Sequence, residues 1–348
     1  MRVTLSDVAT AASVSTYTAS KVLSGQQVSA RIPPATVERV RTAAQTLGYV
    51  PNHTARSLRG RRTGQIGIVL SAPDASETRG DGGSDFDGAL LMGLRVAARE
   101  CGIPAVVVYP QLEDSAVADP ARYLDGRIDG LLVRCALRSD DPLLHLVEPA
   151  RLPMVALWRQ DVPAGVGFAD IDHRGGAFQA VQHLLRLGHR RIAYFDPEWA
   201  SNDLHFALRY EGYCDALRGA SIEPSPEWRV RNSADALALH RLAEPLTAAF
   251  ACSDYYAETL AAALTAAGVS IPADFSLVGF DNSGSAAYIA GGLTTVNHPI
   301  LRMTIQAVRH LVALIDGAPV GECRSIVPTH VVERRSTAPP MACRKGVP

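Results

Sequence analysis

Residues 3–23 read VTLSDVATAASVSTYTASKVL, and this stretch decides how the N-terminal part of the chain folds. Thr4 precedes Asp7 by three residues, the spacing at which a hydroxyl caps a helix start and a carboxylate returns a second hydrogen bond. Small apolar residues follow at helical spacing, a tight turn comes at Ser13, and Ser15 can cap a second helix that runs to the end of the stretch. Two short helices joined by such a turn predict a helix-turn-helix.

Beyond this stretch the chain changes character twice. A third helix is expected from the Pro33-Pro34 pair, which suits a helix start, to Gly48, which suits a helix end. Segment 51–60 could add one or two turns, but it is too short to be a stable helix by itself. From Gln65 short apolar runs alternate with helical stretches, which predicts parallel sheets with helices on both faces.

The apolar runs are too numerous for one small sheet. Ligands in open α/β sheets bind at the carboxyl ends of the strands, so we expect a body of two lobes with a cleft between them. The expected strands are 66–70, 105–109, 130–133, 154–157, 192–195, 248–252 and 277–280, and the expected helices include 86–101, 176–187, 209–218 and 256–267.

Charge is distributed unevenly along the 348 residues, although the formal net charge is only -1. Residues 1–62 hold nine basic and two acidic side chains, and the other 286 residues hold 25 basic and 33 acidic ones. A basic head on an acidic body is typical of a protein that binds nucleic acid through one end only.

Composition excludes several other classes. No apolar run approaches the roughly 20 residues that a membrane span needs, and the first residues lack a secretory signal, so we expect a cytoplasmic protein without a membrane partner. The six cysteines lie far apart with no C-x-x-C pair, which favours scattered thiols over a disulfide framework or a zinc site. No metal and no cofactor is therefore expected.

At this point the sequence resembles the lactose-repressor (LacI/GalR) family of bacterial transcription regulators, almost from end to end. The landmarks in the head and hinge are Val3-Thr4-Leu5-Ser6-Asp7-Val8-Ala9, Val14-Ser15, Thr18, Ser20-Lys21-Val22-Leu23, Leu47-Gly48-Tyr49-Val50-Pro51-Asn52 and Ala55-Arg56-Ser57-Leu58-Arg59. Those in the body are Ile128-Asp129-Gly130, His183-Leu184, Gly188-His189-Arg190-Arg191-Ile192-Ala193, Arg209, Gly212-Tyr213, Val278-Gly279-Phe280-Asp281, Leu293-Thr294-Thr295-Val296 and Arg335-Ser336-Thr337. Each is a weak signal alone, but their joint order and spacing are specific.

The resemblance implies a small all-α helix-turn-helix head on an α/β body of two Rossmann-like lobes, similar to periplasmic binding proteins. It places the DNA-binding domain at 1–49, a hinge segment at 50–62 and an effector-binding and dimerisation domain at 63–348. Within the body, we expect the first lobe at about 63–165 and 298–325 and the second at about 166–297 and 326–340.

Two departures from the family pattern stand out in the head. Ser13 occupies a turn position where the family usually has Gly, and a left-handed backbone there costs a non-Gly residue roughly 1 kcal/mol. About three extra residues lie around Gln26-Gln27-Val28-Ser29, by an ungapped count, which alters how the following loop sits over the DNA backbone.

The DNA contacts follow from the resemblance together with the geometry of the motif. Residues at the front of the second helix face base edges in the major groove, and they are Thr16, Tyr17 and Lys21. Candidates for contacts with the DNA backbone are Ser15, Thr18, Ser20, Asn52, Arg56 and Arg59. Leu58, between two arginines of the hinge, suits insertion into a minor-groove step when a dimer pairs two hinge segments. A two-fold dimer implies a pseudo-palindromic operator.

The effector site also follows residue by residue from the resemblance. Arg209 offers several donors in a fixed fork to hydroxyl or carboxylate oxygens. Asp281 follows an apolar strand and can accept from paired hydroxyls, or else cap a turn. Ser253 stands where the family commonly has Asn, so one amide contact is expected to be absent.

Three further residues complete the candidate site. Trp228 could stack on a sugar ring, or it could serve ordinary packing. His298 could reach the cleft from a segment that crosses between the lobes, or lie on the surface, and Ser71 ends the first strand of the body.

The function implied is that of a transcriptional regulator, a repressor, whose operator affinity depends on a small effector, a sugar or related polyol. A solute-binding receptor is the first alternative, since the body resembles that class, but the basic head argues against it. An enzyme is the second. The pairs Asp172-His173 and Ser253-Asp254 are too common to nominate a catalytic set, and the usual hydrolase, zinc-protease and nucleotide-binding motifs are missing.

Replacing Leu58 with Ala should weaken operator binding, because the paired apolar wedges of the dimer would be lost while the basic hinge residues stay. Effector affinity should remain nearly unchanged, since the hinge lies outside the body. Operator and effector titrations of both proteins check this, and equal operator titrations would contradict it.

Overall fold

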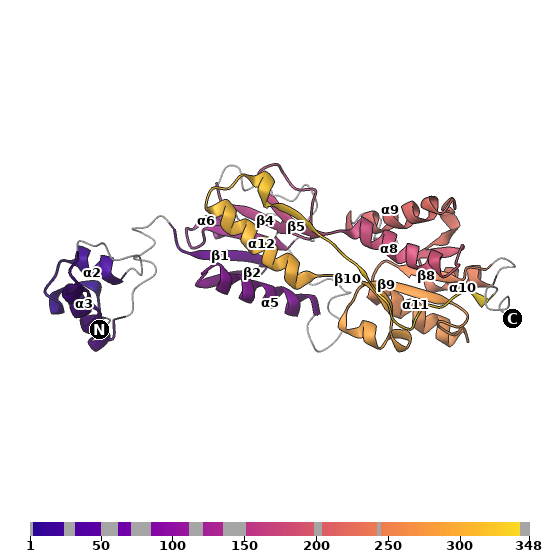
Figure 1. The fold of residues 1–348 in the computed structure, drawn as a ribbon, viewed down its shortest axis with the longest axis horizontal. Coiled ribbons are helices and arrows are strands. Elements are labelled where there is room, and N and C mark those ends of the chain that lie inside the picture. The colour runs from indigo at the N-terminus through magenta and orange to yellow at the C-terminus, as the bar shows by residue number, and fades with distance from the viewer. Residues whose placement is uncertain are drawn as a thin grey trace.

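The computed structural model describes residues 3–23, 32–49, 62–70, 85–110, 121–134, 151–197, 204–241 and 245–341. It has the predicted fold, a helical head followed by a body of two α/β lobes (Figure 1). The head consists of α1 (Leu5–Ala11), α2 (Thr16–Leu23) and α3 (Pro34–Thr46). These helices enclose a small core formed by Val8, Ala9, Ala12, Ala19, Val22, Val40 and Ala44.

The capping groups expected in the head are present. The backbone N–H of Thr4 donates to Asp7 Oδ2 (2.8 Å), and the Asp7 N–H donates to Thr4 Oγ1 (3.3 Å). Ser15 Oγ accepts from the Thr18 N–H (3.1 Å) at the start of α2. Ser13, in the turn between the two helices, has the left-handed backbone that its position implied, with φ 52°.

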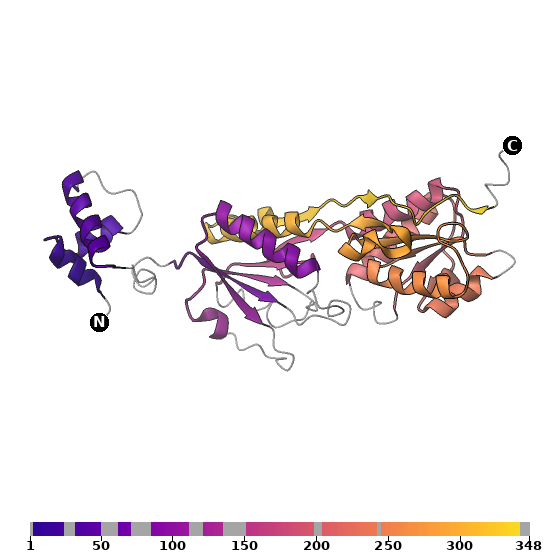
Figure 2. The same cartoon turned by 90° about the horizontal axis from the view of Figure 1, so that it is seen from below.

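The first lobe is built on a parallel six-stranded sheet in the order β11-β5-β4-β3-β1-β2. Its strands are β1 (Gln65–Leu70), β2 (Ala105–Pro110), β3 (Gly130–Arg134), β4 (Met154–Leu157), β5 (Gly167–Ile171) and β11 (Arg324–Val327). Figure 2 shows α5 (Asp85–Glu100) and α12 (Ile300–Ile315) along one face of this sheet. Side chains alternate between two cores, since Ile68 lies in the core that includes residues of these helices and Val69 packs in a separate core with Tyr123 of α6 (Ala121–Leu124).

The second lobe repeats this arrangement in the order β12-β10-β9-β8-β6-β7, with only β12 antiparallel to its neighbour. Its strands are β6 (Ile192–Phe195), β7 (Arg229–Val230), β8 (Ala248–Ala251), β9 (Ser276–Asp281), β10 (Thr294–Asn297) and β12 (Val331–Val332). Its α-helices are α8 (His173–Arg186), α9 (Leu204–Gly219), α10 (Ser233–His240) and α11 (Asp254–Ala266). In each lobe the first strand lies between the second and the third, and ligands bind beside such a strand at its carboxyl end.

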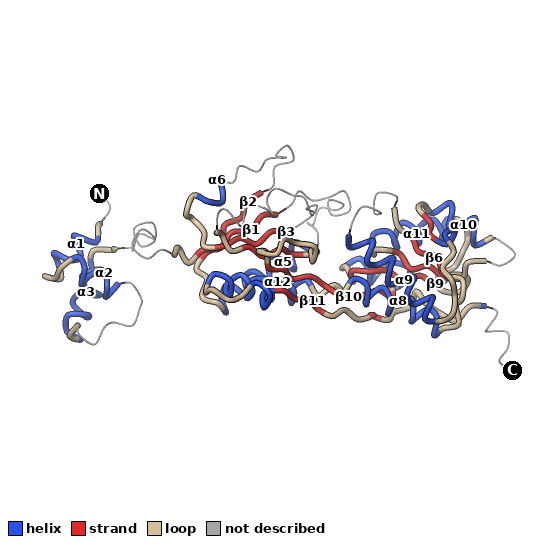
Figure 3. Tube along the Cα trace, turned by 90° about the horizontal axis from the view of Figure 1, so that it is seen from above, coloured by secondary structure: helices blue, strands red, loops and turns tan. Residues whose placement is uncertain are grey.

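The chain crosses between the lobes three times, after β5, after β10 and after β11 (Figure 3). The expected division at residue 165 is therefore wrong, because β5 pairs with β4 and the first lobe continues to Ile171. The later boundary also moves, since β11 belongs to the first sheet as far as Val327. Gly167 and Asp170 interrupt the apolar character of β5, so no apolar run in the sequence marked it as a strand.

The other differences lie at the ends of helices and in short strands. Besides β5, the structure adds the short strands β7, β10, β11 and β12 to those expected. Helix α8 begins at His173 instead of 176, because Asp172 Oδ1 accepts from the Gly175 N–H (2.8 Å) and caps the helix early. Among the described helices, none has both the length and the apolar character to cross a membrane.

Replacing Ser13 with Gly should stabilise the head by about 1 kcal/mol, because Gly adopts a positive φ without the Cβ penalty. Amide hydrogen exchange of α1 and α2 in the full chain measures this as increased protection. Ala11→Gly is the matched control, since the same residue type is then placed in a helical position and should destabilise by a similar amount. Unchanged protection in the Ser13 variant would contradict the strain.

Candidate ligand cleft and nucleic-acid interface

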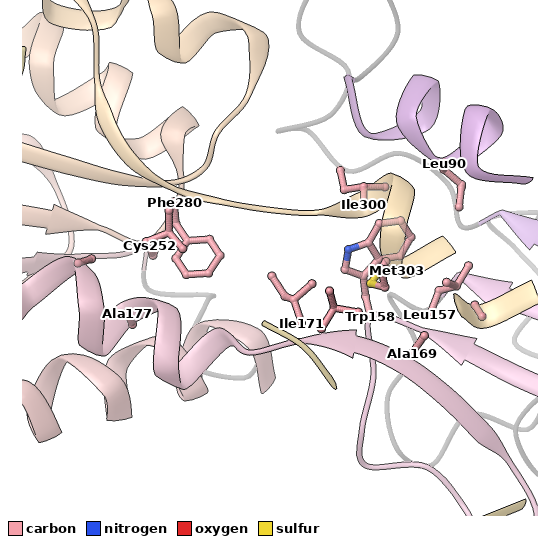
Figure 4. Packing of buried hydrophobic residues seen from close by; sticks show 14 of the residues in the cluster. Leu90, Leu157, Trp158, Ala169, Ile171, Ala177, Cys252, Phe280, Ile300 and Met303 are labelled. Atoms are coloured by element: carbon pink, nitrogen blue, oxygen red, sulfur yellow. The ribbon is translucent and has the colours of Figure 1, made fainter. Parts of the chain in front are cut away.

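Polar side chains from both lobes meet where the carboxyl ends of the two sheets approach each other. Trp158 follows β4, Asp281 ends β9, and His298 follows β10, while Arg209 reaches the same place from α9. Figure 4 shows the apolar side chains beside them, with Phe280 of the second lobe on one side and Trp158 of the first on the other. The strand order and the hydrogen bonds therefore place these side chains together, between the two lobes.

Arg209 is the centre of this site, with only 4% of the residue exposed. Its Nη2 donates to Asp281 Oδ1 (3.2 Å), its Nε donates to His173 Nδ1 (3.2 Å), and its Nη1 donates to the carbonyl of Cys252. The guanidinium carbon lies 3.7 Å from the ring centroid of Phe280. Three acceptors and an aromatic ring therefore fix the plane of the guanidinium. The structure brings Arg209 and Asp281 together, as the sequence suggested.

His298 lies between the two lobes and is buried, with 2% of its side chain exposed. The indole Nε1–H of Trp158 donates to His298 Nε2 (2.6 Å), so a neutral ring carries its proton on Nδ1, which faces Asp281 Oδ1 at 3.5 Å. Burial lowers the pKa of His298, and the opposing effect of Asp281 is smaller. His298 therefore lies between residues of the two lobes, and its side chain is not on the surface.

Two histidines and an aspartate that sequence reasoning passed over lie beside Arg209. His173 Nε2 is 3.2 Å from Asp170 Oδ1, and the His173 ring stacks on His205 with centroids 4.6 Å apart. Burial lowers the pKa of His173, which keeps the ring neutral. Burial opposes ionisation of Asp170, but its interactions with His173 and His205 and the hydrogen bond from the Ile171 N–H together outweigh burial, and the pKa of that carboxyl is lowered. In the sequence His173 stands out only as part of the common pair Asp172-His173, and its place after the end of β5 is the signal that could have singled it out.

Asp170, His173 and His205 also have the donor atoms of a metal site, within 4.8 Å of one another. Arg209 donates to Nδ1 of His173, however, so the proton of the neutral ring is on Nε2 and points at Asp170. A ring nitrogen that carries a proton has no lone pair for a cation. The arrangement therefore fits a chain of hydrogen bonds from Arg209 through His173 to Asp170.

Ser253 and Asp254 lie at the start of α11, where Asp254 is close enough to Asp281 for the two charges to interact. Ser253 Oγ accepts from the Tyr256 N–H (3.4 Å) as the helix cap. Asp254 is buried and accepts from Thr295 Oγ1 (2.6 Å) and from the Ser283 N–H (2.7 Å). Burial, and then the nearby charge of Asp281, raise the pKa of Asp254. This carboxyl supports the turn after β9, a role that the sequence did not reveal.

Trp228 is placed differently from the expectation that it stacks on a ligand. It lies in η3 (Pro226–Trp228), directly before β7, and the guanidinium of Arg191, directly before β6, stands 5.6 Å from its ring centroid. Both residues precede parallel strands, so they lie at the amino edge of the sheet, opposite the cleft. The assignment of Trp228 to the effector site is therefore wrong, and packing explains this residue.

Several other candidates lie outside the described residues. They are Asn52, Arg56, Leu58 and Arg59 of the hinge segment, and Ser71.

The second helix of the head presents the expected readout residues to solvent. Thr16, Tyr17 and Lys21 are exposed, Tyr17 by 70%, while Ala19 and Val22 on the opposite face are buried. Lys21 Nζ donates to the Tyr17 hydroxyl (3.4 Å) and stands 5.5 Å from the ring centroid. This pair orients both polar groups outwards.

Three of the candidates for backbone contacts are described: Ser15 directly precedes α2, and Thr18 and Ser20 lie on it. Ser15 is exposed, and Thr18 and Ser20 are partly exposed. The hydroxyls of Ser15 and Thr18 are 2.9 Å apart, so they form a polar pair at the N-terminus of α2. A helix N-terminus with hydroxyl groups is a suitable partner for phosphate.

Comparison with known proteins agrees with both parts of this structure. The family described as bacterial regulatory proteins, lacI family, matches residues 4–52, and a periplasmic binding protein-like domain matches residues 181–337. The HTH-type transcriptional regulator CelR of Thermobifida fusca is 32% identical over 96% of this chain and 98% of its own length. GalR of Escherichia coli is 28% identical over 97% of this chain and 96% of its own.

Solved structures show the same similarity over nearly the whole chain. A CelR–cellobiose complex is 30% identical, with a TM-score of 0.66, and covers 96% of this chain and 100% of its own. A Lac repressor dimer bound to operator and the anti-inducer ONPF is 25% identical, with a TM-score of 0.74, over 97% of this chain and 100% of its own. The chain thus belongs to the lacI family of bacterial regulatory proteins and is a DNA-binding transcriptional regulator.

Proposed function

We propose that this regulator is a cytoplasmic homodimer that represses transcription from a pseudo-palindromic operator and responds to a small sugar or related polyol bound between its lobes. The observation that carries the proposal is the buried Arg209, whose fixed fork of donors faces Asp281 at the carboxyl ends of the second sheet. A donor and an acceptor side by side match a hydroxyl group, which both gives and takes a hydrogen bond.

The charges around this pair support a neutral ligand. The cation of Arg209 is balanced by Asp281 at 3.2 Å, and burial keeps His173 and His298 uncharged. An anionic ligand would need surplus positive charge, which this group of side chains does not offer. The aromatic ring of Phe206, 5.4 Å from the Arg209 guanidinium, adds an apolar face of the kind that sugars contact. The relative bound to cellobiose fits this chemistry.

Dimerisation is supported by the outer face of the first lobe. Leu91 and Met92 on α5 are 51% and 42% exposed, and Leu301 at the start of α12 is 41% exposed. The backbone carbonyl of Leu301 lies close to Gly93, so α12 begins beside the helix that carries Leu91 and Met92. Exposed apolar side chains of this size are typical of a protein–protein contact.

Effector and operator must influence each other through the body. If binding in the cleft changes how the lobes sit relative to one another, the two first lobes of the dimer shift and the hinge segments pair differently on DNA. By linkage, effector and operator then change each other's affinity by the same factor. We infer that the cleft binds without catalysis, which agrees with relatives that are regulators.

A thermal-shift screen of sugars and nucleosides, with cellobiose included, tests the proposal. At least one sugar should raise the melting temperature of the wild-type protein. Arg209→Lys should lower the affinity for that sugar about tenfold or more, because one ammonium group cannot donate in the three directions that the guanidinium does. Arg218→Lys, on the exposed part of the same helix, is the matched control.

Operator binding measured on the same proteins separates a folding defect from a binding defect. Arg209→Lys should still bind operator in a strongly salt-dependent way, since the head is unchanged. A wild-type protein that binds operator but no sugar or nucleoside, or that hydrolyses the sugar, would contradict the proposed function.

The neutral state of His298 gives a test that needs no effector. Burial lowers the pKa of His298 in the folded protein, so below about pH 6.5 the unfolded chain takes up a proton that the folded chain does not. The associated stability is present above this pH and is lost as the pH falls through the folded-state pKa. His298→Gln keeps an acceptor for Trp158 but cannot titrate.

Chemical denaturation at about pH 7.5 and 5.5 should therefore show a smaller loss of unfolding free energy for His298→Gln than for the wild type. His330→Gln, at an exposed position, is the control and should follow the wild type. An equal loss in all three proteins would show that His298 is not held neutral.

A further inference from the structure

The turn that follows β9 has an unusual backbone. Asp281 and Asn282 have φ angles of 112° and 53°, so two consecutive residues other than Gly lie in the left-handed region. Such conformations cost on the order of 1–3 kcal/mol each and persist only where surrounding contacts enforce them. Because Asp281 carries the carboxylate that faces Arg209, the strain lies directly at the candidate effector site.

One side chain from the far end of the chain holds this turn. Nη2 of Arg334 donates to Asn282 Oδ1 (2.7 Å), and Nη1 of the same guanidinium donates to the carbonyl of Leu293 (2.8 Å). The fork therefore connects the two ends of segment 283–292. The backbone N–H of Arg334 donates to Thr294 Oγ1 (2.9 Å), which fixes the backbone of Arg334 against β10.

The turn is also held by Asp254, whose Oδ2 accepts from the Ser283 N–H (2.7 Å) and from the Ser283 hydroxyl (3.0 Å), and by two bonds to β10 and to the segment after it. The Asn282 N–H donates to Thr295 Oγ1 (3.3 Å), and the carbonyl of Asp281 accepts from the His298 N–H (3.2 Å). These bonds hold both polar groups of the Asp281–Asn282 peptide itself. The contact from Arg334 is the one that holds the side-chain amide of Asn282, and Asn tolerates a left-handed backbone better than most residues.

We propose that Arg334 is a positioning residue for the effector site, which acts through Asn282 to keep the turn left-handed and so aims the Asp281 carboxylate at Arg209 and the ligand. This inference rests on the proposed function, since Asp281 is taken to contact the effector. Arg334 itself belongs to the C-terminal segment after β12 and binds the outer side of the turn.

The substitution Asn282→Gly tests whether Arg334 positions Asp281 or only stabilises the fold, because Gly adopts the left-handed conformation without help from a side chain. Using cellobiose, or the sugar with the largest thermal shift, Arg334→Met should weaken binding about fivefold. Asn282→Gly should bind within about twofold of wild type, and the double variant Asn282→Gly/Arg334→Met should bind no more weakly than Asn282→Gly alone. Arg334→Lys should fall between wild type and Arg334→Met, because one ammonium cannot reach both acceptors as the fork does.

Arg335→Met is the matched control, since Arg335 is the exposed neighbour on the same segment, and its sugar affinity should equal that of the wild type. A second arm needs no ligand. A crystal structure of Arg334→Met should show Asn282 with a negative φ and the Asp281 carboxylate displaced from Arg209.

Three outcomes would overturn the inference. These are an unchanged sugar affinity in Arg334→Met, a double variant whose loss equals the sum of the single losses in free energy, or a variant structure with the turn and the Asp281–Arg209 contact unaltered. If the wild-type protein binds no sugar, the proposed function fails. The crystal structure of the variant then still decides whether Arg334 positions Asp281.

Discussion

The guanidinium of Arg209 is the group on which the arrangement of the cleft depends. A buried cation is costly unless its nitrogens find acceptors, and here each of the three guanidinium nitrogens has one, from Asp281, His173 or the Cys252 carbonyl. These three belong to the end of β9, the start of α8 and the loop after β8. By satisfying its own donors, Arg209 therefore fixes the relative positions of three elements that would otherwise meet only through apolar packing.

The neighbouring histidines extend this constraint across the lobe boundary. His173 can accept from Arg209, and His298 can accept from Trp158, only while each ring is neutral, and burial maintains that state. Trp158 belongs to the first lobe, and its carbonyl also accepts from His205 of α9 in the second. A set of hydrogen bonds that includes two neutral histidine rings thus joins the two lobes, and a ligand that binds between the lobes must exchange some of these bonds for its own.

Strained backbone occurs at several candidate functional positions, although Arg151, Ser221 and Ala290 have positive φ angles elsewhere. Ser13 in the turn of the head, Trp158 beside His298, and Asp281 with Asn282 all have positive φ angles. In each case neighbouring hydrogen bonds enforce the conformation, as with the Val14 N–H that donates to the Ala9 carbonyl (2.9 Å) across the turn at Ser13. Strain of this kind fixes the direction of a side chain or a helix more tightly than rotamer preference alone.

The sequence by itself determined the fold class, the head with its caps at Thr4 and Ser15, and the pair Arg209 and Asp281, because caps, periodicity and family landmarks are local signals. It misplaced the lobe boundary and Trp228, and it passed over Asp170, His173 and Arg334. His173 and Arg334 acquire their roles from partners that are distant in sequence: Arg334 meets Asn282 across 52 positions, and His173 meets Arg209 across 36. Only the tertiary structure decides such pairs, because a hydrogen bond depends on distance in space, which the order of residues does not specify.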